Sequence, residues 1–443
     1  MKVALLMPNG FKGALDRALN EISKYKSKLA DEKPDLIVFP EDYLTSSNTE
    51  DLFNNGEKLA HKLYSEHGCI VAIGLGLGRP SKKVKKVENT HYLLVYADDK
   101  SFKYQKHAFT YESAIDSPGW VERWKDSFLL TITRDGIKVS FSLCYDMYLP
   151  FIAREYRERG THLYVNPSYR NVKYNKWAAM LQGRALEGGF YVACVLHHDG
   201  AGKGRGGSKG YALVYDPYGS PITFREGLTP YQTGGRPGLY TFSVDPQVVE
   251  EAREKLRQGL ASWRELKVRS DDYKFPKYGE TRGLKVKFTK EGLLIDGVKI
   301  DPRERFRGID GVEVVTLSFE ELMKPGTSTK IGVLRAEQTA RDLVYVCFID
   351  EGLEDATLRL LPQRLLRLRS LENRAAFLIA SRRSSSFIGS QPTSKVFQPQ
   401  DVESSHGEGW VNKDFIKGPL STLRSALKKD SRVNKVIKVI KQL

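Results

Sequence analysis

Short apolar runs alternate with amphipathic stretches over the first 275 residues of the chain. Apolar runs bounded by Gly, Pro or Asp predict buried strands, among them residues 3–7, 35–41 and 69–76. Between these runs, apolar positions spaced three and four residues apart predict helices, for example over 14–29 and 52–67. Strands that alternate with helices in this way predict an α/β fold.

Paired strands interrupt this alternation further along the chain. The stretch 128–146 contains the turn sequence Arg134-Asp135-Gly136 and therefore predicts a hairpin, which makes the sheets mixed and not purely parallel. The other predicted strands and helices of this part lie at residues 90–97, 150–159, 162–167, 174–188, 190–197 and 210–217.

A change in composition divides the chain into two parts. An amphipathic helix is predicted over 249–270, so we expect a first domain over 1–275, a linker over 276–283 and a smaller α+β module over 284–443. Within the module, the Ser/Pro/Gln-rich segment 381–405 is expected to be mobile. The predicted elements of the module are a hairpin turning at 290–292, strands at 312–317 and 343–350, and a helix near 335–342.

Composition narrows the class of protein. The 443 residues are 40% hydrophobic, which is typical of a globular chain and excludes a disordered one. No run approaches the roughly 18–20 apolar residues of a membrane helix, and the N-terminus reads as a strand and not a signal peptide. The four cysteines form no CxxC pair, which predicts a reducing, cytoplasmic setting without a disulfide framework or structural zinc.

The charge is unevenly distributed. The net charge is +16, and residues 281–443 contain 29 basic and 20 acidic side chains, more than half of the excess. A basic module is compatible with nucleic acid as a partner, but no nucleic-acid-binding motif is present, and a solvated surface is the favoured interpretation. The basic residues of the last predicted helix are Lys428, Lys429, Arg432, Lys435, Lys438 and Lys441.

Three chemically active side chains follow predicted strands. Glu41 lies in IVFPEDYL, Lys106 in FKYQKHAF and Cys144 in VSFSLCYDMYLP. In α/β proteins, functional groups gather at strand ends, where loops hold side chains on rigid supports. A carboxylate can accept the proton of a thiol nucleophile, and an ammonium can stabilise an oxyanion. Each residue alone is more typical of an ordinary core or surface position, so spacing does not decide the function.

The three segments FPEDYLT, YQKHAF and SLCYDMYLP resemble, in order, the three signatures of the nitrilase (carbon–nitrogen hydrolase) superfamily. Further matches are HLYVNPSY, WAAMLQGRALEGGFYVACV and GSKGYALVYDPYGSPI, so the resemblance covers roughly residues 1–275. It implies a four-layer α-β-β-α sandwich for that part, with the C-terminal module outside the resemblance.

The resemblance also implies a mechanism. Cys144 would attack the carbonyl or nitrile carbon, Glu41 would accept the thiol proton and pass it to the leaving nitrogen, and Lys106 with the backbone N–H of Tyr145 would hold the oxyanion. Water activated by Glu41 would then release the acyl group. The implied enzyme is a thiol-dependent amidohydrolase that cleaves a non-peptide C–N bond of a small amide, carbamoyl compound or nitrile, with no cofactor and no metal.

A second carboxylate near the lysine completes the site that the family uses. Glu122, in SPGWVERW, and Glu112, six residues after Lys106, are the two candidates. Glu122 is preferred because its flanking residues also resemble the family's Pro-Gly-aromatic-x-Glu segment.

The chain departs from the family pattern next to the expected pocket. Candidates for lining that pocket are Tyr169, Trp177 and His197. His197-His198 stands where the family usually has Asn, and adjacent histidines in a strand point in opposite directions, so a shared metal is not expected. Arg184 and Glu187 are expected to form a buried structural ion pair. Residues 202–207 are interpreted as a loop over the site, in which Lys203, Arg205 and the nearby Lys209 could meet an anionic substrate.

Two of the predicted helices bear on the oligomeric state. The helices at 150–159 and 174–188 are rich in large apolar residues, which predicts faces that a second subunit covers and hence at least a homodimer. A different class of function also stays open: a regulated effector or scaffold whose module 284–443 binds a protein or nucleic-acid partner and controls the first domain.

Overall fold

The computed structural model divides the chain into two compact units, Met1–Ala252 and Arg253–Leu443. The predicted boundary after residue 275 falls among residues that are not described. The described residues are 1–9, 13–77, 91–107, 129–169, 174–198, 209–265, 283–289, 292–309, 311–339, 342–349, 361–373, 375–381, 386–393, 396–402 and 408–412.

The first sheet of the N-terminal unit has the strand order β12-β1-β2-β4-β5-β6, with β3 also paired to β4. Its bounds are β1 (Lys2–Met7), β2 (Leu36–Val38), β3 (Leu44–Ser46), β4 (Ile70–Leu77), β5 (His91–Ala97), β6 (Lys100–Gln105) and β12 (Gly238–Ser243). Strands β1, β2 and β4 run parallel, whereas β5, β6 and β12 are antiparallel to their neighbours. The predicted mixed pairing is confirmed.

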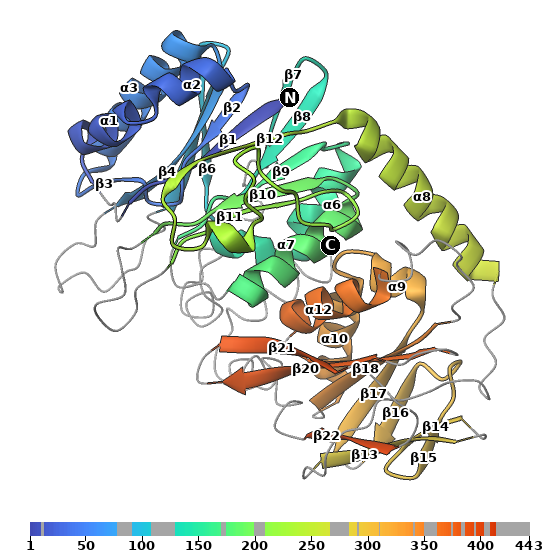
Figure 1. The fold of residues 1–443 in the computed structure, drawn as a ribbon. Coiled ribbons are helices and arrows are strands. Elements are labelled where there is room, and N and C mark those ends of the chain that lie inside the picture. The colour runs from blue at the N-terminus through green and yellow to red at the C-terminus, as the bar shows by residue number, and fades with distance from the viewer. Residues whose placement is uncertain are drawn as a thin grey trace. The chain divides into compact units, whose positions relative to one another are not determined.

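The second sheet has the order β11-β10-β9-β8-β7. Its bounds are β7 (Leu130–Arg134), β8 (Ile137–Phe141), β9 (Leu163–Val165), β10 (Tyr191–Val195) and β11 (Ala212–Tyr215). Strands β7 and β8 form the hairpin expected at Arg134-Asp135-Gly136. Helices α6 (Pro150–Glu158) and α7 (Tyr174–Gly188) pack on this sheet, and α1 (Leu15–Ser23), α2 (Lys26–Glu32) and α3 (Thr49–His67) cover the first sheet (Figure 1).

Alternation of side chains along the strands builds two apolar layers. In β1, Val3 and Leu5 face the second sheet and pack against residues such as Val139 and Val165, while Ala4 and Leu6 face the helices. Because successive side chains of a strand point to opposite faces, one apolar strand contributes to both layers. The four-layer α-β-β-α sandwich is thereby confirmed for this unit.

Two details differ from the sequence-based expectation. The helix predicted over 14–29 is two helices, because the N–H of Tyr25 donates to the carbonyl of Ile22 at 2.8 Å and tightens the end of α1. The expectation of bare apolar faces on α6 and α7 is wrong, since Phe151, Trp177 and Met180 are buried by the chain itself. The homodimer stays a prediction, without support from these faces.

The described residues of the C-terminal unit form two sheets. Strand order is β15-β14-β13-β22 in one and β16-β17-β18-β19-β20-β21 in the other, where β17, β18 and β19 run parallel. The strands are β13 (Gly283–Thr289), β14 (Gly292–Ile295), β15 (Val298–Ile300), β16 (Phe306–Ile309), β17 (Val312–Leu317), β18 (Asp342–Ile349), β19 (Ala376–Ser381), β20 (Ser386–Thr393), β21 (Val396–Val402) and β22 (Glu408–Asn412). The helices are α8 (Pro246–Glu265), which begins in the first unit, α9 (Phe319–Met323), α10 (Thr327–Gln338) and α12 (Leu361–Asn373).

In this unit one predicted helix has other bounds, and one segment predicted to be mobile contains strands. The bounds of the helix predicted near 335–342 are wrong. Helix α10 begins at Thr327 and ends at Gln338, and strand β18 begins at Asp342. Strands β20 and β21 lie within 381–405, so the Ser/Pro/Gln-rich composition does not prevent strand pairing there. In the described part of the chain, no helix has both the length and the apolar character required to cross a membrane.

Candidate active site

Glu41 lies in a tight turn that follows β2. Two glycines of β4 leave room for this turn: a Cβ on Gly74 would lie 2.2 Å from the carbonyl oxygen of Pro40, and one on Gly76 would lie 2.3 Å from Oδ1 of Asp42. Asp42 itself has a φ of 56°, a region that residues other than glycine rarely adopt. The turn is therefore sterically tightly defined, and it buries the Glu41 side chain almost completely.

Lys106 comes directly after β6 and meets Glu41. Its Nζ lies 2.7 Å from Oε1 of Glu41, and both side chains are buried. The backbone N–H of Lys106 donates to the carbonyl of His91 at 3.1 Å, which anchors the lysine to β5. A buried ammonium paired with a buried carboxylate is a strong, well-oriented interaction, and breaking such a pair leaves an uncompensated charge.

Cys144 follows β8 and opens a short 3₁₀ helix, η1 (Cys144–Tyr148). Its φ is 48°, a strained conformation for a cysteine, and its N–H donates to the carbonyl of Pro167 at 2.9 Å. Cys144 is partly exposed, whereas the other cysteines, Cys69, Cys194 and Cys347, are buried. Of the four cysteines, the one at the strand-to-helix turn is thus the least buried.

The charges of these three residues act on one another. Burial raises the pKa of the Cys144 thiol above its ordinary value of 9.0, and the Glu41 carboxylate raises it further, against the opposing effect of the Lys106 ammonium. Burial by itself lowers the pKa of Lys106, but the charge that Cys144 carries once it is deprotonated, together with the charge and hydrogen bond of Glu41, outweighs it and the pKa is raised. The site at rest therefore holds a protonated thiol beside a charged lysine.

Asp146 connects the cysteine turn to the lysine strand. Its Oδ1 accepts the backbone N–H of His107 at 2.9 Å, and its Oδ2 accepts the Tyr104 hydroxyl at 2.8 Å and the N–H of Leu143 at 3.2 Å. The carboxylate is fully buried. It thereby fixes the residue after Lys106 relative to the residue before Cys144.

The structure brings other predicted residues to the same region. The backbone N–H of Tyr169 hydrogen-bonds the sulfur of Cys144, which lowers the pKa of that thiol, and the Tyr169 ring lies edge-on to the His197 ring at 5.4 Å. Trp177 is buried, and its Nε1 donates to Sγ of Cys194 at 3.1 Å. The ring of Tyr145, the residue after Cys144, stacks on Tyr148.

Glu122, Glu112, Lys203 and Arg205 lie outside the described residues, as does the basic segment 428–441. Lys209 is described and exposed.

Arg184 and Glu187 form the expected buried ion pair. Nη1 of Arg184 donates to Oε1 of Glu187, and both side chains have no exposed surface. The same guanidinium donates through Nε and Nη2 to the carbonyl of Met147, at 2.9 and 2.7 Å. The pair therefore fastens α7 to η1, the short helix that Cys144 begins.

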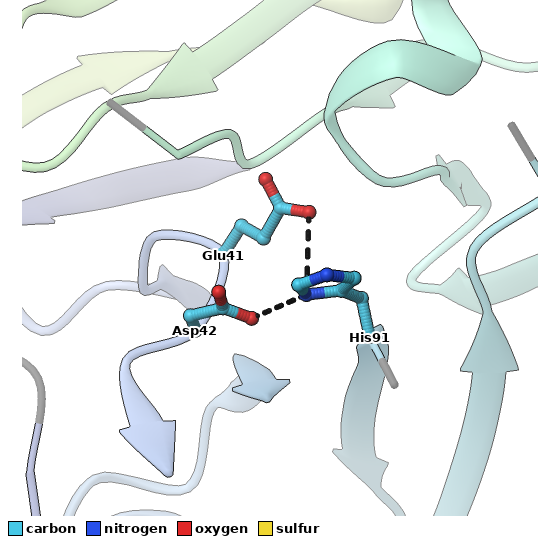
Figure 2. A group of neighbouring side chains, drawn as sticks. All are labelled: Glu41, Asp42 and His91. Carbon is cyan, nitrogen blue, oxygen red and sulfur yellow. Dashed lines mark hydrogen bonds and ion pairs between the residues drawn. The ribbon is translucent and has the colours of Figure 1, made fainter. Parts of the chain in front are cut away.

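Sequence reasoning did not single out Asp42 and His91. Nδ1 of His91 lies 2.7 Å from Oδ1 of Asp42 and 3.9 Å from Oε1 of Glu41 (Figure 2). The ligand atoms of these three residues lie within 4.8 Å of one another, a spacing compatible with a metal ion. Lys106 Nζ, however, already supplies a positive charge at 2.7 Å from the same Glu41 oxygen, so the geometry favours an ion pair and not a metal centre.

Part of the chain is similar to known proteins. The family model of carbon–nitrogen hydrolases matches residues 2–253. The 2-oxoglutaramate amidase of Bacillus subtilis (strain 168) is 25% identical over 237 residues, which are 50% of this chain and 82% of that protein. The nitrilase and fragile histidine triad fusion protein NitFhit of Caenorhabditis elegans is 30% identical over 153 residues, 33% of this chain and 31% of that protein.

Among solved structures, an amidase from Nesterenkonia sp. covers 59% of this chain and 96% of its own, at 17% identity and a TM-score of 0.43. The family match spans more than half of the chain, so the protein belongs to the carbon–nitrogen hydrolase family, as the three sequence signatures predict. It is therefore an enzyme of the class that hydrolyses carbon–nitrogen bonds. The family match ends at residue 253.

Proposed function

We propose that this enzyme is a thiol-dependent amidase that cleaves a non-peptide C–N bond of a small linear amide through a thioester on Cys144. The observation that carries the proposal is the buried contact between Oε1 of Glu41 and Nζ of Lys106, together with the effect of both charges on the Cys144 thiol. A base, a cation and an accessible thiol at one site are the elements that acyl transfer requires.

In this mechanism Glu41 accepts the thiol proton as Sγ of Cys144 forms a bond to the amide carbon. Oε2 of Glu41 is buried and has no hydrogen-bond partner among the described residues, so it is the oxygen available for the proton. The raised pKa of Cys144 means that proton transfer accompanies the attack, since little thiolate exists beforehand. Glu41 then passes the proton to the leaving nitrogen, and ammonia or an amine departs.

The amide oxygen becomes an oxyanion during the attack. Lys106 contributes a positive charge, and the backbone N–H of Tyr145 contributes a hydrogen bond in the proposal. Oriented donors at the developing charge supply the largest single share of stabilisation in reactions of this kind. Water, deprotonated by Glu41, then attacks the thioester and releases the carboxylic acid.

The substrate class is proposed from chemistry and from the relatives. An amide substrate accords with the name of the Bacillus subtilis relative, a 2-oxoglutaramate amidase. Carbamoyl compounds and nitriles have carbon centres open to the same attack and stay in the test. Hydrolysis, in place of transfer of the acyl group to another acceptor, is part of the proposal.

A panel of primary amides, carbamoyl compounds and nitriles tests this function. Ammonia release by the full chain is measured beside the Cys144→Ala variant at matched concentration. Release from short amides that disappears in the variant supports the proposal. Release that persists in the variant, or no release from any panel member by the wild-type enzyme, contradicts it.

A second proposal concerns the C-terminal unit, because it has two sheets of its own and lies outside the family match. We propose, as the alternative function, that this unit binds a partner and regulates the hydrolase. Its test is retention of the full chain on DNA or RNA at low and high salt, with amide turnover measured in both states. Turnover that never changes with a bound partner contradicts it.

A further inference from the structure

Two imidazoles contact the Glu41–Asp42 turn from the two different sheets. Nδ1 of His91, the first residue of β5, lies 2.7 Å from Oδ1 of Asp42. Nε2 of His197, two residues after β10, lies 2.7 Å from the carbonyl oxygen of Glu41. Because a carboxylate and a carbonyl accept hydrogen bonds, His91 donates through Nδ1 and His197 donates through Nε2.

The space around the turn is shaped for the first of these contacts. Gly76 pairs with His91 across β4 and β5, and a side chain at Gly76 would occupy the place of the Asp42 carboxylate. The missing Cβ lets the carboxylate reach the imidazole, and Figure 2 shows the ring facing both Asp42 and Glu41. Asp42, with its positive φ, is thus held by its side chain where the backbone by itself is strained.

His91 also contacts the other side of the ion pair. Its backbone carbonyl accepts the N–H of Lys106 at 3.1 Å. One residue therefore holds the neighbour of Glu41 through its ring and holds Lys106 through its backbone. His197 holds the backbone of Glu41 from the opposite sheet, and its ring is buried.

We propose that His91 and His197 are positioning residues, a histidine clamp that fixes the Glu41 carboxylate between Lys106 and Cys144. The inference rests on the proposed function, because it is Glu41 as proton acceptor that the clamp serves. It gives His197 a role through the Glu41 backbone, in place of the substrate-lining role expected from the sequence.

Two measurable consequences follow from loosening the clamp. A displaced Glu41 is a poorer proton acceptor, and a displacement of about 1 Å can lower turnover by a factor of about 100. The Glu41 charge also contributes to the raised pKa of Cys144, whereas Lys106 acts in the opposite direction. When Glu41 moves away from the thiol, one of the two raising effects weakens while burial and the opposing effect of Lys106 remain, so the pKa of Cys144 falls from its raised level.

Substitution of each histidine by Asn or Gln distinguishes the effect of the hydrogen-bond donor from the effect of side-chain size. An asparagine side chain carries its NH₂ group near the position of Nδ1, and a glutamine side chain reaches near the position of Nε2. His91→Asn and His197→Gln therefore keep a donor in place, while His91→Gln and His197→Asn misplace it. The four variants form a crossed set in which each substitution controls for the other.

Each variant is measured in two ways as the full chain. The first is kcat and KM for the amide that the wild-type enzyme hydrolyses fastest. The second is the pH profile of Cys144 alkylation by iodoacetamide, followed by intact-mass spectrometry with Glu41→Gln as the reference for a missing charge. Cys69, Cys194 and Cys347 are buried, so a single adduct per chain reports an intact fold.

The clamp predicts kcat within about threefold of wild type for His91→Asn and His197→Gln, with an unchanged alkylation profile. For His91→Gln and His197→Asn it predicts a kcat at least tenfold lower, a KM that changes little, and a profile moved to lower pH towards that of Glu41→Gln. Equal behaviour of Asn and Gln at either position overturns the clamp. If the wild-type enzyme hydrolyses no amide, the proposed function fails, and the alkylation profiles still decide the clamp.

Discussion

Nζ of Lys106 lies 2.7 Å from Oε1 of Glu41, and this contact joins residues 65 positions apart in the sequence. Glu41 and Lys106 follow two different strands of one sheet, β2 and β6. Because both are buried, neither charge is screened by water, and each depends on the other. The contact places a base and a cation beside the same thiol.

Replacing the cation tests its role in the reaction. Lys106→Ala removes one oxyanion partner and should lower kcat by about 10²–10³, equivalent to roughly 3–4 kcal/mol. Lys103→Ala lies on β6, the strand that Lys106 follows, and has a half-exposed side chain; it is the matched control and should change kcat little. A Lys106→Ala enzyme with normal kcat and raised KM would show that the lysine binds substrate without stabilising the oxyanion.

The second carboxylate has two candidates and one paired test. Glu122→Gln should lower kcat by at least two orders of magnitude, because a neutral amide cannot balance the charge of Lys106, while Glu112→Gln should be nearly silent. Steady-state kinetics on the two purified variants decides between them. The reverse result makes Glu112 the catalytic partner, and silence of both places the second carboxylate elsewhere.

Asp146 is expected to matter for stability. Asp146→Asn replaces one carboxylate oxygen by an NH₂ group, so at least one of the donors from Tyr104, His107 and Leu143 loses its acceptor. The free energy of unfolding should fall by about 1–3 kcal/mol in urea denaturation. Asp135→Asn is the control, since Asp135 is exposed in the β7–β8 turn and Asn tolerates its φ of 50°. Equal losses in the two variants would refute the connecting role of Asp146.

Buried thiols predict a loss of stability at alkaline pH. Burial raises the pKa of Cys69 from 9.0 to about 12, with a smaller opposing effect of Arg134. Because the folded-state pKa is raised, the contribution of the buried Cys69 thiol to the free energy of unfolding is fully present below pH 9. It is lost as the pH rises from 9 towards 12, because the unfolded chain releases the proton first. Between pH 9 and 12, the free energy of unfolding of Cys69→Ala should fall with pH less steeply than that of the wild-type protein, by up to about 1.4 kcal/mol per pH unit. Identical slopes from urea denaturation at several pH values would contradict this.

Glu41, Lys106 and Cys144 could be predicted from the sequence because each follows a strong strand pattern. The role of His91 could not be predicted from the sequence. Its contact with Asp42 depends on the pairing of β4 with β5 and on the absence of a side chain at Gly76, and a local sequence pattern shows neither. The break between α1 and α2 contains no Gly or Pro, so the sequence does not predict it. The amphipathic patterns of α6 and α7 correctly indicated apolar faces, but a pattern does not say whether the same chain or another covers them.

In the proposed mechanism Cys144 carries the acyl group during turnover. The most direct measurement is intact-mass spectrometry of the full chain, quenched in acid during steady-state hydrolysis of an amide. The mechanism predicts a mass increase equal to the acyl group on the peptide that contains Cys144. This increase should be absent from Cys144→Ala, which should retain its fold and lose turnover. Turnover by Cys144→Ala within tenfold of wild type, or an acyl group on another residue, would contradict it.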